Sequence, residues 1–443
     1  MKHFIVYTLL FSICALWGCS ADGDGVTDIA DADYIRFGAQ VVEPVTRAAA
    51  QKPGIIDFEK LTTTSFGVYG YGPMAAAYTD GLTPDLFDNQ EVKYVVTDKS
   101  TSTVLAVPGS WSYAWDGSKE VVAQLKPWPK TNASANKHTF FAYAPYMAEG
   151  GVAPGITSVS SSVAGDPQIG YRVSTVPSTS VDLLWGVQSE TGLPWKNVTR
   201  AKKSASAVLF TMRHALCAVS YQAQVMVNKD NELTDLGDVS STAAIGTDCR
   251  VTIDSVTLQP KSGGQDFYAS GTLNLNNTTK NTPLWTPGDR SIDKLVLDGT
   301  EIDAKVRDPD PADGNNILFM ATTSVPGITE SANSQAVIAN NNVFMLLPDD
   351  VAQTYELEVP YYVTYRLKAG TYSRRRYVGK VTIPDLKLKA GTLYRFNMVF
   401  GLTTFKLTVT AEDWTETPVY VTTVVETSTS ASSSLSRRAA SAE

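Results

Sequence analysis

Residues 34–47 read Tyr-Ile-Arg-Phe-Gly-Ala-Gln-Val-Val-Glu-Pro-Val-Thr-Arg, and the rest of the chain is organised around this stretch. Two sets of residues alternate in its first half: Ile35, Phe37, Ala39 and Val41 against Arg36, Gly38 and Gln40. A period of two predicts a half-buried β-strand. Pro44 ends the strand because proline offers no backbone donor to a ladder. Arg47 and the alanines after it form a linker that a trypsin-like protease could cut, although an ordinary first strand and loop explain the same pattern.

Composition favours a soluble globular protein rich in β structure. The 443 residues allow two or three domains, and Thr, Ser, Val, Tyr and Gly are prominent, which favours β structure. The net charge of −8 excludes a nucleic-acid partner, because no basic stripe exists to displace phosphate counterions. Beyond the N-terminus, no stretch approaches the roughly 18–20 apolar residues of a membrane span.

The N-terminus has the pattern of a targeting segment. Lys2 and His3 give a basic start, residues 4–17 an apolar core, and Leu16-Trp17-Gly18-Cys19 a cleavage site. This site resembles the lipobox of bacterial lipoproteins. The resemblance implies that residues 1–18 are removed and that Cys19 carries lipid, such as palmitate, which anchors the chain in a membrane. A plain signal peptide cut nearby is the alternative.

Two cysteines remain after processing, because Cys14 leaves with the signal and Cys19 is lipidated. Export permits a disulfide between Cys217 and Cys249. Two buried free thiols fit the sequence equally well, since spacing does not decide the geometry.

Many short alternating runs separated by turn signals predict an all-β fold built from sandwich domains. No segment has the pattern of a long amphipathic helix. The predicted organisation is a signal peptide at 1–18, a lipidated propeptide with an acidic tether at 19–47, an N-terminal β-sandwich domain at 48–204, a C-terminal β-sandwich domain at 205–425 and a disordered tail at 426–443.

Catalytic and metal sites find little support in the sequence. His138 and His214 lie in different predicted domains and lack a clear nucleophile or metal partner. The acidic runs 22–33 and 308–314 break the spacing of a Ca²⁺ loop, so no metal or cofactor is expected. Two surface features stay open: a sugar platform formed by the aromatic residues Trp111, Trp115, Trp128 and Tyr146, and a partner contact at Arg374, Arg375 and Arg376.

Several segments together resemble the fimbrillin family, the lipoprotein subunits of type V pili of Gram-negative anaerobes. The resemblance rests on the order and spacing of these pieces: the lipobox at Cys19, Ile35-Arg36-Phe37 with Val45-Thr46-Arg47-Ala48, Phe66-Gly67-Val68-Tyr69, the strand 138–146, His214-Ala215-Leu216, the segment 388–394 and Ala411-Glu412-Asp413-Trp414. They cover nearly the whole chain, although no single piece is specific.

The resemblance implies two transthyretin-like β-sandwich domains in tandem and no enzymatic activity. It also implies a precursor held at the surface of the outer membrane by the lipid on Cys19. An Arg-specific protease would cut between Arg47 and Ala48. The strand carrying Ile35, Phe37 and Val41 would then leave, and a strand from another copy or a related fimbrial subunit would fill the groove, building a pilus that supports adhesion.

A donor strand must lie elsewhere in the chain. Residues 418–425, Pro-Val-Tyr-Val-Thr-Thr-Val-Val, place Val419, Val421 and Thr423 on one face beyond the expected end of the second domain. They are a candidate donor or, equally, the last strand of their own domain. Two alternatives to a polymerising subunit remain. One is a tip adhesin or glycan-binding surface lipoprotein that binds a host or bacterial ligand, and the more distant one is an exported hydrolase.

Overall fold

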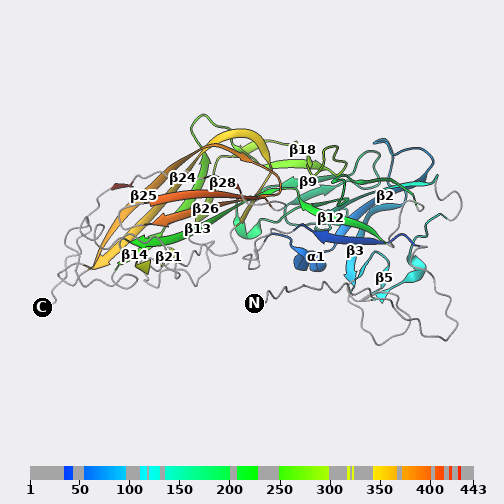
Figure 1. Cartoon of the computed structure of the whole chain (residues 1–443), viewed down its shortest axis with the longest axis horizontal. Coiled ribbons are helices and arrows are strands. Elements are labelled where there is room, and N and C mark those ends of the chain that lie inside the picture. The colour runs from blue at the N-terminus through cyan, green and yellow to red at the C-terminus, as the bar shows by residue number, and fades with distance from the viewer. Residues whose placement is uncertain are drawn as a thin grey trace, which may run out of the picture.

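The computed structural model describes residues 34–42, 54–95, 110–116, 119–129, 135–199, 207–227, 249–298, 317–319, 322–323, 343–366, 372–400, 405–413, 419–421 and 428–430. These residues form an all-β fold whose sheets pack in sandwich-like layers, which confirms the predicted fold class. The molecule is elongated, with strands β2 (Phe66–Met74) and β3 (Phe87–Val95) toward one end and the long hairpin β24–β25 toward the other (Figure 1).

The first sheet is formed mainly by the N-terminal half. Its strand order is β1-β12-β10-β7-β2-β3-β4, and β11 also pairs with β7. The strands not yet given bounds are β1 (Phe37–Val41), β12 (Val208–His214), β10 (Leu184–Val187), β7 (Lys137–Ala144), β4 (Ser110–Ser112) and β11 (Trp195–Val198).

Both faces of this sheet are buried, because its central strands alternate between two cores. On β2, Phe66 and Val68 belong to one apolar cluster while Tyr69 and Tyr71 belong to the other. The first cluster is covered by helix α1 (Phe58–Thr64) through Leu61, and we call it the N-terminal core. The second continues into the C-terminal half, and we call it the main core.

The C-terminal half contains two further sheets that face each other. One has the order β22-β13-β26-β27-β28, with β23 on β13; the other has the order β20-β15-β24-β14-β21, with β25 on β24 and β29 on β25. The ring of Tyr361 on β24 lies 5.0 Å from that of Phe400 on β26, so the sheets pack directly. Their strands are β13 (Cys217–Val227), β14 (Cys249–Ile253), β15 (Ser255–Pro260), β20 (Leu295–Asp298), β21 (Ile317–Phe319), β22 (Thr322–Thr323), β23 (Val343–Leu346), β24 (Asp349–Arg366), β25 (Tyr372–Leu388), β26 (Thr392–Phe400), β27 (Phe405–Asp413), β28 (Val419–Val421) and β29 (Ser428–Ser430).

A small sheet joins the two halves, because β9 (Gln168–Arg172) pairs antiparallel with β17 (Ser270–Asn274) in the order β18-β17-β9-β8. The remaining elements are β8 (Ile156–Val159), β18 (Leu284–Pro287), the pairs β5 (Trp115–Asp116) with β6 (Lys119–Glu120) and β16 (Phe267–Tyr268) with β19 (Arg290–Ile292), and the 3-10 helices η2 (Val122–Gln124) and η3 (Pro177–Thr179).

Strand pairing describes how the chain passes from the first sheet to the C-terminal sheets, whereas the domain boundary at 204/205 stays a prediction. Strand β12 still belongs to the first sheet, and the chain enters the second half at Ala215 and Leu216. Within the tail predicted to be disordered, Ser428–Ser430 form the short strand β29 on β25.

Candidate functional site: the first strand and its groove

Strand β1 occupies an edge of the first sheet. It pairs with β12 alone among the described strands, in parallel, from Phe37 opposite Val208 to Val41 opposite Met212. The amide of Val208 donates to the carbonyl of Arg36 at 2.7 Å, just before the strand begins. Removal of an edge strand breaks only its own hydrogen bonds to the one neighbouring strand. The topology of the sheet therefore allows β1 to leave.

The apolar face of β1 fills the N-terminal core. Ile35 is completely buried, Phe37 and Ala39 are nearly so, and Val41 is half-buried. Four aromatic rings surround that of Phe37, with centroid distances of 5.1 Å to Phe87, 5.7 Å to Tyr113, 5.5 Å to Phe140 and 6.0 Å to Phe210. The side chains of the predicted removable strand, Ile35, Phe37 and Val41, therefore hold β1 against the N-terminal core.

A second segment holds the beginning of this strand from the other side. We call it the clasp: residues 110–116 and 119–128, from β4 through the β5–β6 pair to Trp128. The amide of Ile35 donates to the carbonyl of Lys126 at 2.8 Å, and the Tyr113 hydroxyl donates to the carbonyl of Ile35 at 2.9 Å. Residues 34–36 thus lie between the clasp and the start of β12.

A buried ion pair crosses from the strand to the clasp. Nη1 of Arg36 lies 2.7 Å from Oε1 of Glu120, and the Ser112 hydroxyl donates to the same oxygen at 2.7 Å. The alternation of residues 35–41 places Arg36 on the exposed face, but the arginine is only 8% exposed. That prediction is wrong at Arg36 because the clasp covers this face; Gln40, beyond the clasp, is exposed.

The predicted donor strand lies in another sheet. Residues 419–421 form β28 at the edge of the β13-β26-β27 sheet, antiparallel to β27, with Val421 opposite Val409 and Val419 opposite Ala411. In this state they are an edge strand of the C-terminal half, and β29 follows them in the chain. Cys19, Arg47, Ala48 and Thr423 lie outside the described residues.

The two histidines occupy separate buried sites. His138 packs against the ring of Trp128 at 5.0 Å, and burial lowers the pKa of its imidazole. Nδ1 of His214 lies 2.5 Å from Oδ2 of Asp182, which also accepts from the amide of Ile56. Both histidines are at most 4% exposed, so a substrate does not reach them in this state.

The residues of the candidate sugar platform are buried or half-buried. Trp111 and Trp128 are buried, while Trp115 and Tyr146 are half-buried. Nζ of Lys93 also covers the Trp115 ring, 3.6 Å from its centroid. These rings serve packing, since a sugar platform needs an accessible aromatic face.

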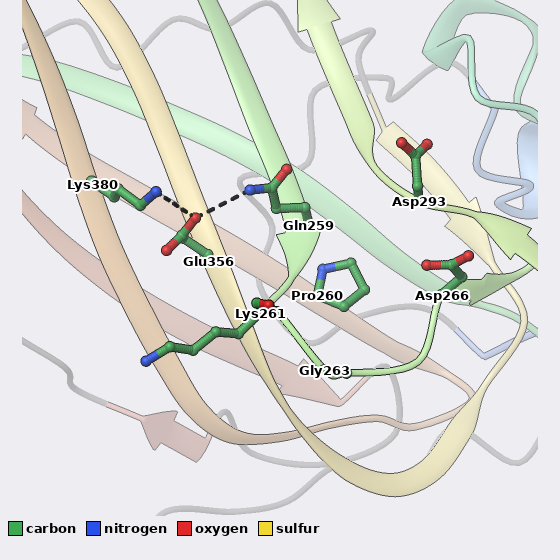
Figure 2. Close-up of a pocket in the computed structure, with 10 residues that line it drawn as sticks. Gln259, Pro260, Lys261, Gly263, Asp266, Asp293, Glu356 and Lys380 are labelled. Carbon is green, nitrogen blue, oxygen red and sulfur yellow. Dashed lines mark hydrogen bonds and ion pairs between the residues drawn. The ribbon is translucent and has the colours of Figure 1, made fainter.

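A surface pocket of about 470 Å³ lies beside the turn 260–266 (Figure 2). Glu356 points toward Lys380 at 2.8 Å and accepts from the Gln259 amide at 3.1 Å, so these charges already pair with each other. Its described lining contains no aromatic ring that could stack on a sugar. The pocket therefore offers solvated polar groups and no evident recognition surface.

Other predicted features are placed as follows. Cys217 is a free, buried thiol whose sulfur lies 3.5 Å from the Leu346 carbonyl, and burial raises its pKa. Arg375 and Arg376 are exposed, and the 308–314 loop lies outside the described residues. Among the described residues, no three potential ligand side chains converge on a metal site, and no helix is long and apolar enough to cross a membrane.

Sequence reasoning missed the clasp. Glu120 and Tyr113 lie 84 and 78 residues from their partners Arg36 and Ile35, and short-range patterns do not reveal such pairs. The available signal was Arg36 itself, a permanent charge inside an apolar run, which raises the question of a buried partner.

Comparison with solved structures finds proteins of similar architecture. A fimbrial protein from Bacteroides vulgatus has a TM-score of 0.56 and 18% identity, over 86% of this chain and 99% of that chain. Candidate cell adhesion proteins from Bacteroides uniformis and Bacteroides ovatus give TM-scores of 0.37 and 0.35 at 14% identity, over 88% and 86% of this chain and 100% and 97% of theirs. No protein-family model and no curated protein matches the chain. At 18% identity, the first likeness shows a shared fold.

Proposed function

We propose that this protein is a structural, non-catalytic subunit of a cell-surface fimbria that assembles by strand exchange and supports adhesion. Its precursor is exported as an outer-membrane lipoprotein through Cys19 and cleaved between Arg47 and Ala48. The observation that carries the proposal is β1: an edge strand whose buried apolar side chains hold it in the sheet, and which ends at Val41, six residues before Arg47.

Loss of β1 makes the binding of a replacement strand strongly favourable in free energy. Ile35 and Phe37 together contribute about 3–6 kcal/mol by burial. Their departure exposes the rings of Phe87, Tyr113, Phe140 and Phe210 and leaves one edge of β12 unpaired, while its other edge stays paired with β10. A strand from another chain restores both interactions. Such a contact is head-to-tail and does not close on itself, so it propagates a filament.

The donor that we propose is the segment 418–425. Its described part, β28, is short and pairs only with β27 among the described strands, so its release breaks few ladder bonds. The likeness of the fold to a fimbrial protein supports a fimbrial role for the chain. The glycan-binding alternative lacks a supporting observation, because Trp111 and Trp128 of the candidate platform are buried and Lys93 covers the ring of Trp115.

The test uses the purified precursor, residues 20–443, with a trace of Arg-specific protease. We expect a ladder of polymers whose new N-terminus is Ala48. Arg47→Ala should remain uncut at this site and monomeric. A chain lacking 418–443 should be cut but should not extend. Clean cleavage at Arg47 that leaves only monomer would contradict the proposal.

A further inference from the structure

The ion pair between Arg36 and Glu120 divides between the two parts that cleavage would separate. Arg36 belongs to the strand that leaves, while Glu120 belongs to the clasp that stays. Glu120 is 5% exposed, and its carboxylate side chain has no exposed surface. Removal of β1 therefore withdraws the cation from a buried anion.

No described side chain of the clasp replaces that cation. Ser112 donates one hydrogen bond to Oε1, and Oε2 has no hydrogen-bond partner among the described residues. Of the lysines described nearby, Lys126 donates to the Leu86 carbonyl and Lys93 lies over Trp115. A buried carboxylate that loses its partner is strongly unfavourable, far more so than one hydroxyl can offset.

We propose that the groove vacated by β1 selects an incoming strand that carries lysine or arginine at the register of Arg36. This inference rests on the proposed function and adds the chemistry of the partner. The geometry gives the order of the required residues: apolar at 35, basic at 36, large and apolar at 37, and small at 38. The last requirement arises because a Cβ on Gly38 would lie 3.1 Å from Cδ1 of Leu209.

The occupant is a protein strand, because the groove combines an apolar floor with a free β edge. The chain's own segment 418–425 contains no lysine or arginine. A copy of this protein is therefore a weaker donor than a related subunit whose donor strand carries a base. Arginine is the better match, since a planar guanidinium suits a carboxylate that already accepts from a hydroxyl.

The experiment measures binding of labelled peptides to the precursor, residues 20–443, cleaved at Arg47 in dilute solution with the peptide in excess, so that the peptide and not the segment 418–425 of another copy fills the vacated groove. The first peptide is residues 34–42, and its variants carry Arg36→Lys, Arg36→Gln or, as a control, Gln40→Ala. We expect the native and lysine peptides to bind and the glutamine peptide to bind roughly 30-fold more weakly or worse. The control should change affinity by less than about threefold, because Gln40 is exposed.

A second protein, Glu120→Gln, completes a double-mutant cycle. It should lose its preference for arginine over glutamine in the peptide, and a peptide of residues 418–426 should gain affinity relative to its binding to the unchanged protein. If the unchanged protein binds the native and glutamine peptides equally, the proposed selection for a basic residue is wrong, but the proposal that a strand fills the groove is retained. If it binds none of the peptides, the groove and the proposed function are both wrong. The comparison on the unchanged protein decides the matter even if Glu120→Gln fails to fold.

Discussion

At the scale of single residues, Phe37 contributes more than any other side chain to the seating of β1. It is 3% exposed and lies within 6.0 Å, centroid to centroid, of four other rings. Phe37→Ala should lower the free energy of unfolding of the uncleaved precursor by about 3–5 kcal/mol, through lost burial and the cavity left behind. Chemical denaturation measures this loss.

The matched control lies on the same strand. Gln40→Ala should cost less than about 1 kcal/mol, because this side chain is exposed and makes a single hydrogen bond, 3.0 Å to Thr211. Equal losses for Phe37→Ala and Gln40→Ala would show that the N-terminal core does not depend on β1.

His138 gives the protein a pH-dependent stability. Burial lowers its pKa below the unfolded value near 6.5, so the unfolded state binds more protons as the pH falls through that value. Stability is therefore retained above about pH 6.5 and decreases below it, by up to about 1.4 kcal/mol at pH 5.5. The measurement is chemical denaturation at pH 7.5 and 5.5. His138→Phe should show a smaller decrease, and the same decrease as in the unchanged protein would assign the effect elsewhere.

At the scale of elements, β1 and β28 are both edge strands, yet they are held differently. β1 has a buried apolar face, hydrogen bonds to β12 and the clasp at its start. β28 has three register pairs with β27. Deletion of 418–443 should therefore lower the free energy of unfolding of the precursor by less than about 2 kcal/mol and leave unfolding cooperative. Urea denaturation tests this, and a non-cooperative transition would mean that the segment is integral to its domain.

The sequence predicted those elements whose signal is local. The alternation of β1 and of β26, where Phe396, Met398 and Phe400 are buried, is visible in the residues themselves. The strand that pairs with β1 cannot be recognised from the sequence, because Phe37 and Val208 are distant in the chain and pair in parallel. The ion pair to Glu120 is likewise a product of tertiary packing, so the pattern placed Arg36 in solvent.

At the scale of the whole molecule, the two cores divide the protein into regions that should respond differently to processing. The N-terminal core contains β1, the clasp and one face of the first sheet, while the main core contains the other face and the C-terminal sheets. The central strands separate these clusters. Loss of β1 should therefore loosen one core and leave the other intact.

Hydrogen exchange followed by mass spectrometry tests this separation on the chain lacking 418–443, which keeps the cleaved protein monomeric. After cleavage at Arg47 and release of the N-terminal fragment, amides in 208–214 should exchange faster, because they lose acceptors on residues 34–42. Amides in 110–128 should also exchange faster, because the clasp loses the packing and the hydrogen bonds that tie Lys126 and Tyr113 to Ile35. Amides in 343–366 should keep their protection, because the C-terminal sheets supply their partners. The peptide of residues 34–42, added in excess, should restore protection in the first two segments, since it returns both the ladder and the buried face. Uniform loss of protection would show that β1 stabilises the entire fold, and a subunit that depends on its leader in this way could not survive the exchange.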